Sequence, residues 1–402
     1  MIDLLRQHPR EHVAIVDSAA GERLGYGELG DRAAAAAELL RAATGDRALV
    51  FLAMAPDAGA VVLYLACLHA GLPVCLTDTQ PEALARLATA YRPSLLLLPA
   101  PVDAPAGYRE HPSPAPGYRA WLGGEPVALH PDLALLLTTS GSTGDPKLVR
   151  LTRRNLESNA DSIGEYLGLG PAERAVMSLP MHYSYGLSVL NSHLRAGGSV
   201  VLTPHSFMRP EFWAAADGER CTSFAGVPYM YETLHRLRFD PARHPSMRTL
   251  TQAGGGLRHD LAAHFEQIGA RSGVRFFVMY GQTEATARIS YVPAERLARK
   301  IGSIGIAIPG GALSLAAVEG AADLKELVYA GPNVMLGYAD SRADLALGDV
   351  QHGSLKTGDL ASVDDDGYYS ITGRLKRFAK LDRKSTRLNS SHSSPSRMPS
   401  SA

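Results

Sequence analysis

The chain has 402 residues, of which 46% are hydrophobic and 20% are charged, and this balance excludes collagen-like and wholly disordered proteins. Forty basic and forty acidic residues give a formal net charge of zero, so the composition offers no broad footprint for nucleic acid or for an anionic membrane. Three cysteines without metal-type spacing are typical of reduced thiols and indicate a cytoplasmic protein; they are Cys67, Cys75 and Cys221.

Short apolar runs alternate with segments of helical length through the first part of the chain, a pattern typical of a parallel α/β sheet. Residues 48–54 are expected to form a buried strand. A helix is expected from Pro56-Asp57 to about His69, because Gly71 and Pro73 end it. The same interruptions break the most apolar stretch of the chain, so no membrane span is expected. The start, MIDLLRQHPREH, lacks a basic region followed by an apolar run, so no secretion signal is expected either.

Further strands are expected at 92–100 and 132–139. A second alternating block follows, with expected strands at 175–180, 199–204, 222–228, 249–256 and 274–281 and expected helices at 186–197, near 212–217, from Tyr229 and from His259. Beyond Gly302, short strands and turns replace this alternation. We therefore predict an α/β fold with two α/β subdomains followed by a β-rich subdomain.

The end of the chain differs in composition from the rest. Residues 382–402 contain eight serines and almost nothing apolar, so they cannot contribute to a packed core. One codon choice for 382–392 also spells a common sequencing adapter, so we expect an artefactual end there, with a genuine disordered tail as the alternative.

The segment 138–147, TTSGSTGDPK, is the sharpest motif in the sequence. Its glycines let backbone N–H groups turn toward an anion, its hydroxyl groups add donors and Lys147 adds a charge, so a polyphosphate is the expected ligand. It is not a Walker A loop, because Lys147 follows Asp-Pro and precedes Leu148. A polar surface turn is the alternative interpretation of such a cluster.

Further segments follow in order: LPMHYSYG at 179–186, AGGGL at 253–257, YGQTEA at 280–285, GSIGIAIPG at 302–310, TGD at 357–359 and GRLKRFAK at 373–380. Together with 138–147, they resemble the adenylate-forming superfamily of acyl-CoA synthetases, peptide-synthetase adenylation domains and luciferases. The resemblance spans nearly all of residues 1–381. It implies a large N-terminal AMP-binding domain, 1–375, made of two α/β subdomains and a distorted β-barrel; the implied parts are about 1–175, 176–301 and 302–375.

The resemblance also implies a site for ATP. The loop 139–147 is similar to the loop that closes over the β- and γ-phosphates; its implied binding residues are Thr139, Ser140, Gly141, Ser142, Thr143, Gly144 and Lys147. Tyr280 resembles the aromatic residue that stacks on adenine, and Gly281 and Gln282 follow it. Close backbone approach to the base and to the acyl group needs glycine, which implies a role for Gly254, Gly255 and Gly256. A flexible turn is the alternative for these three glycines.

Phosphate, magnesium and ribose contacts are implied as well. Thr283 is similar to the residue that binds the α-phosphate, and Glu284 to the Mg²⁺ ligand, whose hard carboxylate oxygen suits that ion. Asp359 looks like the carboxylate that accepts both ribose hydroxyls, and Arg374 like the guanidinium that reaches ribose and phosphate. The alternatives are a solvated carboxylate that caps a helix for Glu284 and a commonplace turn for 357–359.

The acid substrate is expected beside LPMHYSYG. Tyr183 falls where the family places a residue that gates the carboxylate tunnel, and it completes the implied catalytic set of Thr143, Lys147, Tyr183 and Glu284. Gly186 stands where amino-acid-activating members carry Asp, so a carboxylic acid without an α-amino group, fatty or aryl, is favoured. The expected pocket residues are Tyr183, Tyr185, Gly186, Phe224, Gly226 and Val227. For Phe224 and Val227, an ordinary core position is the alternative.

The resemblance implies ATP-dependent formation of acyl-AMP from the acid, followed by transfer to CoA. Transfer to the phosphopantetheine of an acyl carrier protein, or nucleotide binding without catalysis, are the alternatives. Complete members carry a C-terminal α+β domain that brings a lysine to the reaction and shapes the thiol tunnel. Here 376–381, with Lys376, resembles only the hinge before that domain, so a truncated chain with weak or no activity is expected.

Overall fold

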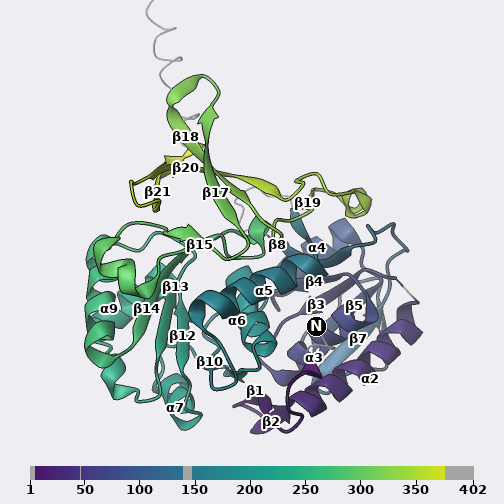
Figure 1. The fold of residues 1–402 in the computed structure, drawn as a ribbon. Coiled ribbons are helices and arrows are strands. Elements are labelled where there is room, and N and C mark those ends of the chain that lie inside the picture. The colour runs from purple at the N-terminus through teal and green to yellow at the C-terminus, as the bar shows by residue number, and fades with distance from the viewer. Residues whose placement is uncertain (1–4, 46, 139–146, 376–402) are drawn as a thin grey trace, which may run out of the picture.

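The computed structural model describes residues 5–45, 47–138 and 147–375, which form two large sheets with flanking helices and a smaller third sheet (Figure 1). The first large sheet has eight strands in the order β19-β9-β8-β4-β3-β5-β7-β6. Its strands are β3 (Val50–Ala53), β4 (Val74–Thr77), β5 (Leu95–Pro99), β6 (Arg109–His111), β7 (Tyr118–Leu122), β8 (Leu133–Thr138), β9 (Leu148–Thr152) and β19 (Gly337–Ala339).

The second large sheet has nine strands in the order β16-β15-β14-β13-β12-β10-β11-β1-β2. Its strands are β1 (Val13–Asp17), β2 (Glu22–Gly25), β10 (Arg174–Val176), β11 (Ser199–Leu202), β12 (Ser223–Gly226), β13 (Thr249–Gln252), β14 (Arg275–Tyr280), β15 (Ser290–Tyr291) and β16 (Ile306–Ala307). The strands from β1 to β14 in this order pair in parallel, as predicted from the alternation of strands and helices.

Helices pack between and around the two large sheets. Helix α5 contacts β8 and β9 of the first sheet, whereas α6 contacts β10 and β11 of the second, and the two helices pack together (Figure 1). The α-helices are α2 (Tyr26–Thr44), α3 (Ala58–Ala70), α4 (Pro81–Tyr91), α5 (Arg153–Leu167), α6 (Ser184–Arg195), α7 (Pro210–Gly218), α8 (Pro228–Arg236) and α9 (His259–Ser272). Short 3₁₀ helices are η1 (Pro241–Arg243), η2 (Thr283–Ala285), η3 (Ala294–Arg299) and η4 (Arg342–Ala346).

The predicted boundaries of α3 are confirmed. The Asp57 side chain caps its N-terminus by accepting a hydrogen bond from the Ala60 N–H at 2.8 Å, and Gly71 ends it with φ 72°. The helix is apolar on every side and almost entirely buried, because it packs on β3 and β4 of one sheet and on β1 of the other.

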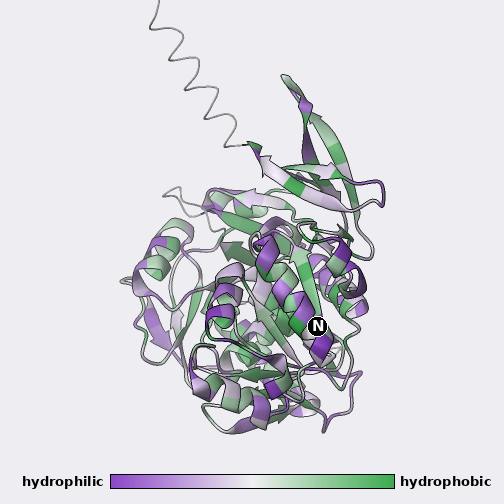
Figure 2. Ribbon diagram, turned by 90° about the vertical axis from the view of Figure 1, so that its left-hand side faces the viewer, coloured by the Kyte–Doolittle hydropathy of each residue, from purple (hydrophilic) through white to green (hydrophobic). Residues whose placement is uncertain are grey.

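The β-rich part expected beyond Gly302 forms an antiparallel sheet in the order β17-β18-β20-β21. Its strands are β17 (Ala312–Val318), β18 (Ala321–Ala330), β20 (Ser354–Val363) and β21 (Tyr369–Arg374). This small sheet stands above the edges of the two large sheets in Figure 1 and projects from the body in Figure 2.

The large sheets draw strands from distant parts of the chain. Strands β1 and β2 precede residue 175 but belong to the nine-stranded sheet, where Ile15 pairs with Val200. Strand β19 lies beyond residue 302 but pairs with β9, Tyr338 opposite Val149. Each large sheet therefore combines strands from more than one of the segments 1–175, 176–301 and 302–375 that the resemblance implies.

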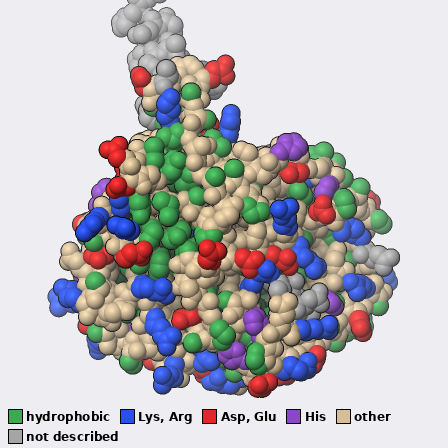
Figure 3. All heavy atoms as spheres, in the orientation of Figure 1, with side chains coloured by type: hydrophobic (Ala, Val, Ile, Leu, Met, Phe, Trp, Pro, Cys, Tyr) green, Lys and Arg blue, Asp and Glu red, His purple; other side chains and the backbone are tan. Residues whose placement is uncertain are grey.

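Charged side chains of both signs mingle over the face shown in Figure 3, and hydrophobic side chains gather beneath the small sheet. Within the described ranges, no helix combines the length and the apolar character that crossing a membrane requires.

Candidate functional site

Connections that carry predicted binding residues follow neighbouring parallel strands. Strands β12, β13 and β14 pair in parallel, and Val227, Ala253 and Gly281 come directly after them. Because the carboxyl ends of parallel strands meet at one edge of a sheet, these connections converge there. The small sheet lies over this edge and supplies Asp359 and Arg374 (Figure 1).

Asp359 is the centre of a hydrogen-bonded cluster. Its side chain is 4% exposed, and its carboxylate accepts a hydrogen bond from the Tyr280 hydroxyl at 2.6 Å and one from the Gln282 amide at 3.1 Å. Arg374 stands opposite Asp359 in the β20–β21 register and donates from Nε to Oδ1 at 2.8 Å. The structure thus brings together four residues that the sequence placed around one nucleotide.

The Tyr280 hydroxyl is held as a donor in this cluster. Burial raises the pKa of Tyr280 well above its ordinary value, and the adjacent Asp359 carboxylate raises it further. The hydroxyl therefore stays protonated and directs its proton toward the Asp359 oxygen, which accepts the hydrogen bond. The Arg374 side chain remains 66% exposed, so its outer nitrogens stay accessible to a ligand.

A second group joins Lys147 to Glu284 through Tyr338. The Lys147 Nζ lies 3.6 Å from the centroid of the Tyr338 ring, and the Tyr338 hydroxyl donates to Glu284 Oε1 at 2.6 Å. Lys147 also pairs with Asp340, at 3.3 Å between Nζ and Oδ1. Burial first, and then the bond to Glu284, raise the pKa of Tyr338, so its hydroxyl remains a donor.

Sequence reasoning missed Tyr338 and Asp340. They lie in and just after the three-residue strand β19, which carries no motif and no periodicity long enough to detect. Pairing with β9, which follows the predicted phosphate loop, brings them to Lys147. Tyr338 thereby joins the predicted phosphate-binding lysine to the predicted magnesium ligand.

The connection after β14 is held in a narrow conformation. A Cβ atom on Gly281 would lie 1.6 Å from the Ala287 carbonyl oxygen, so only glycine fits. Thr286 and Ala287 both have positive φ, and the Thr286 hydroxyl donates to the Asn333 carbonyl at 2.6 Å. Within this connection, Thr283 Oγ1 lies 3.2 Å from the Ser184 hydroxyl at the start of α6.

The predicted acyl residues surround the connection after β13. A Cβ on Gly254, where φ is 81°, would lie 2.8 Å from the Tyr183 hydroxyl and 3.0 Å from Val227 Cγ1. Gly255, with φ 159°, approaches Pro228 instead. Close packing therefore requires glycine at 254, and it places the predicted gate Tyr183 directly beside this backbone.

Tyr185 and Phe224 are both buried. The Tyr185 hydroxyl donates to the Thr251 carbonyl at 2.9 Å, and a Cβ on Gly226 would meet the Tyr231 and Phe224 rings at 2.9 and 3.1 Å. Phe224 also lines a small cavity of about 20 Å³ beneath this region. Phe224 is thus a buried core residue that also lines this cavity.

Gly186 is closely packed in the first turn of α6. A Cβ there would lie 2.2 Å from the Pro180 carbonyl oxygen and 2.9 Å from that of Leu179. This backbone therefore excludes any side chain at the position where Asp would bind a substrate ammonium. Nearby, Asp78 Oδ2 lies 3.9 Å from His182 Nε2.

Some predicted residues lie outside the described ranges. They are Lys376 and the phosphate-loop residues Thr139, Ser140, Gly141, Ser142, Thr143 and Gly144. Gly256 is described, and a Cβ there would meet no atom within 4 Å. Among the described residues, no group of three or more His, Cys, Asp or Glu side chains forms a metal site.

Comparison with known proteins places these observations in a family. Residues 4–339 match the AMP-binding enzyme family. A feruloyl-CoA synthase from Amycolatopsis sp is 35% identical over 258 residues, 62% of this chain and 51% of that protein. A sulfoacetate–CoA ligase from Cupriavidus necator is 34% identical over 331 residues, 80% of this chain and 58% of that protein. The chain thus spans little more than half the length of these curated relatives.

A solved structure shares the fold. The N-terminal domain of FACL13 from Mycobacterium tuberculosis, bound to an inhibitor, superposes with a TM-score of 0.75 at 21% identity. The match covers 93% of this chain and 99% of that one. The predicted fold, that of the N-terminal domain of adenylate-forming enzymes, is confirmed.

Proposed function

Because the chain belongs to the AMP-binding enzyme family, we propose that it activates a carboxylic acid with ATP, as part of an acid–CoA ligase. The acid carboxylate attacks the α-phosphorus of ATP, acyl-AMP forms and pyrophosphate leaves. The thiolate of CoA then attacks the acyl carbon, which gives the thioester and releases AMP. CoA is the favoured acceptor because the relatives named above are a CoA synthase and a CoA ligase.

The observation that carries the proposal is the Asp359 cluster. A buried carboxylate that already accepts bonds from Tyr280, Gln282 and Arg374 is preorganised for a ligand with hydroxyl donors, such as ribose. Two oxygens offer about four acceptor positions, and the three bonds to the protein leave one of them, on Oδ1, for a ligand hydroxyl. The exposed outer nitrogens of Arg374 lie next to the same carboxylate and suit a phosphate.

Mg²⁺ fits the second group of residues in the site, which consists of Lys147, Tyr338 and Glu284. Mg²⁺ is commonly held by one or two carboxylates together with substrate phosphates and waters, so a single protein carboxylate suffices. Glu284 would supply that oxygen, and the hydrogen bond from Tyr338 orients its carboxylate. The ion would neutralise phosphate charge, while Lys147, directed by the Tyr338 ring and Asp340, would contact the outer phosphates.

Replacing Tyr338 by phenylalanine tests this orienting role. We expect about a tenfold weaker affinity for MgATP, because Glu284 loses a hydrogen bond to a charged acceptor, with a smaller change for ATP in excess chelator. Calorimetric titration with and without Mg²⁺ measures both values. Tyr369→Phe, which removes a 3.0 Å bond to the Leu313 carbonyl in the small sheet, is the matched control. Equal Mg²⁺ dependence in the two variants would contradict the role of Tyr338.

Gly186 leads to an expectation about the acid. A substrate ammonium buried without a carboxylate partner loses several kcal/mol of hydration, and no side chain fits at Gly186 to offset that loss. Phenylpropionate and hexanoate should therefore bind about tenfold or more tightly than phenylalanine and norleucine. Competition against a bound acyl-AMP analogue measures the four affinities. Tighter binding of both amino acids would contradict this expectation. If that preference for the amino acids then disappeared in Asp78→Asn, Asp78 would be identified as the residue that binds their ammonium group.

Binding of ATP to the chain is the direct test of the proposed function. Calorimetry should show one site for MgATP, with AMP competing at the same site. The affinity should fall when the Asp359 cluster is disrupted. An affinity that is insensitive to Asp359 would contradict the proposal.

A further inference from the structure

Arg288 is a buried cation that lacks a carboxylate partner. Its side chain, in a residue that is 3% exposed, takes part in none of the ion pairs between described residues, and its Nε has no hydrogen-bond partner. The guanidinium carbon lies 3.9 Å from the centroid of the Tyr185 ring. Since buried charges in proteins are normally paired, this arrangement calls for an anion.

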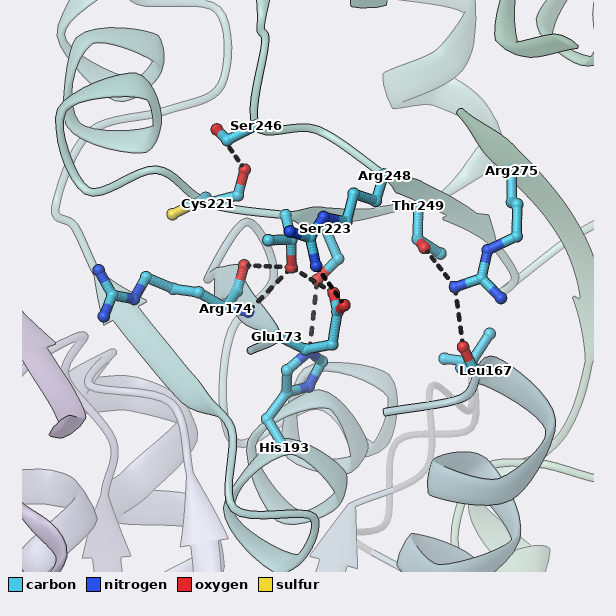
Figure 4. Close-up of polar contacts among 11 residues, drawn as sticks. Leu167, Glu173, Arg174, His193, Cys221, Ser223, Ser246, Arg248, Thr249 and Arg275 are labelled. Carbon is cyan, nitrogen blue, oxygen red and sulfur yellow. Dashed lines mark hydrogen bonds and ion pairs between the residues drawn. The ribbon is translucent and has the colours of Figure 1, made fainter. Parts of the chain in front are cut away.

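The cavity that Arg288 lines has no other unsatisfied group among its described residues. His193 is hydrogen-bonded through both ring nitrogens: Nδ1 with the Val189 carbonyl at 2.9 Å, and Nε2 with the Ser223 hydroxyl at 3.3 Å (Figure 4). Burial lowers the pKa of His193, so its ring is neutral. Arg288 therefore supplies the positive charge of this cavity.

A neighbouring arginine shows the contrast. Arg275, on β14, donates to the Leu167 carbonyl at 2.9 Å and to the Thr249 hydroxyl at 3.1 Å (Figure 4). Thr249 and Leu167 both line the same cavity, so the protein itself satisfies Arg275 at the cavity wall. Arg288 is far more deeply buried, and although its guanidinium interacts with the Tyr166 hydroxyl, its Nε has no hydrogen-bond partner.

The cavity adjoins the expected acid site. Phe224 belongs to both, and the Tyr185 ring that faces Arg288 lies 6.4 Å, between centroids, from the ring of the predicted gate Tyr183. At the other end of the expected acid site, the hydroxyl oxygen of Ser184, which lies between these two tyrosines in the sequence, is 3.2 Å from Thr283 Oγ1. An acid whose carboxylate is activated near Thr283 would therefore direct its tail toward Tyr185 and Arg288.

We propose that Arg288 binds a second anionic group at the far end of the acid, so that the substrates are short carboxylic acids with a terminal carboxylate or sulfonate. This inference rests on the proposed function and names its substrate class. A guanidinium matches the planar, two-oxygen face of such groups. The free volume of about 20 Å³ holds one or two water molecules and no long hydrocarbon tail, which favours a short acid.

Calorimetric titration of the chain with matched acids tests this proposal. Glutarate and 3-sulfopropanoate carry a terminal anion, whereas monomethyl glutarate and pentanoate present an uncharged end of similar length. We expect the dianions to bind at least about tenfold more tightly than the acids with an uncharged end, because only a terminal anion can accept charged hydrogen bonds from Arg288. Equal affinities for charged and uncharged ends would overturn the proposal.

Variants assign the preference to the residue. Arg288→Met should abolish it, Arg288→Lys should keep part of it, and Arg275→Met should leave it intact. Thermal unfolding shows whether each variant folds. If a variant does not fold, the comparison of acids on the unaltered chain still tests the proposal. A preference that survives in folded Arg288→Met overturns the assignment. If the chain binds MgATP and acids with an uncharged end but does not bind dianions, this inference is overturned and the proposed function is retained. If the chain does not bind ATP, the proposed function itself is refuted.

Discussion

Replacing Asp359 by asparagine should weaken MgATP binding by about 100-fold or more. A ribose hydroxyl would lose its hydrogen bond to a charged acceptor, and such a bond contributes about 1.5–3 kcal/mol. The asparagine amide would also direct N–H donors at Tyr280 or Arg374, which are themselves donors to this side chain. Isothermal titration with MgATP and with AMP measures the loss, which should be similar for both because they share the ribose.

Asp366→Asn is the matched control for this change. Asp366 lies in the turn between β20 and β21 of the same small sheet, pairs with Lys300 at 2.6 Å and has a side chain that is 73% exposed. An exposed pair of this kind contributes little to stability, so nucleotide affinity should not change. A comparable loss in both variants would indicate a general disturbance of the sheet and would contradict the ribose role of Asp359.

Gly281→Ala should disable the site through the backbone. The new methyl group would lie 1.6 Å from the Ala287 oxygen and 2.7 Å from its carbonyl carbon, and neither atom belongs to a flexible side chain. The connection must shift, which displaces Thr283 and Glu284. We expect a loss of about 1–3 kcal/mol in the free energy of unfolding, as for other overpacked positions. MgATP affinity should fall at least tenfold in the same protein, and denaturant titration with calorimetry measures both quantities.

The same substitution at Gly164 should have the opposite effect on stability. Gly164 lies inside α5, and a Cβ there would meet no atom within 4 Å. Glycine in a helix costs about 0.5–1 kcal/mol relative to alanine, so Gly164→Ala should stabilise the fold and leave MgATP affinity unchanged. A loss of nucleotide affinity in Gly164→Ala, or none in Gly281→Ala, would show that the connection after β14 does not control the site.

Local structure could be predicted from the sequence, and so could most members of the two groups of residues that the structure brings together. The ends of α3 depend on Asp57 and Gly71, whose effects reach only one turn of the chain. The parallel strands β12, β13 and β14 follow from short apolar runs separated by helices, and their carboxyl ends meet wherever such strands pair. Asp359, Tyr280 and Glu284 were found because each lies in a short motif that resembles those of a known family.

Contacts between distant segments were decided by the tertiary structure alone. Tyr338 reaches Lys147 because β19, too short to show periodicity, pairs with β9. The burial of Arg288 depends on how the connection after β14 packs beneath Tyr185, and a basic residue next to a strand looks like a surface residue in the sequence. Motifs and caps act over a few residues, whereas strand order and burial depend on the whole chain, and this difference in range separates the two kinds of knowledge.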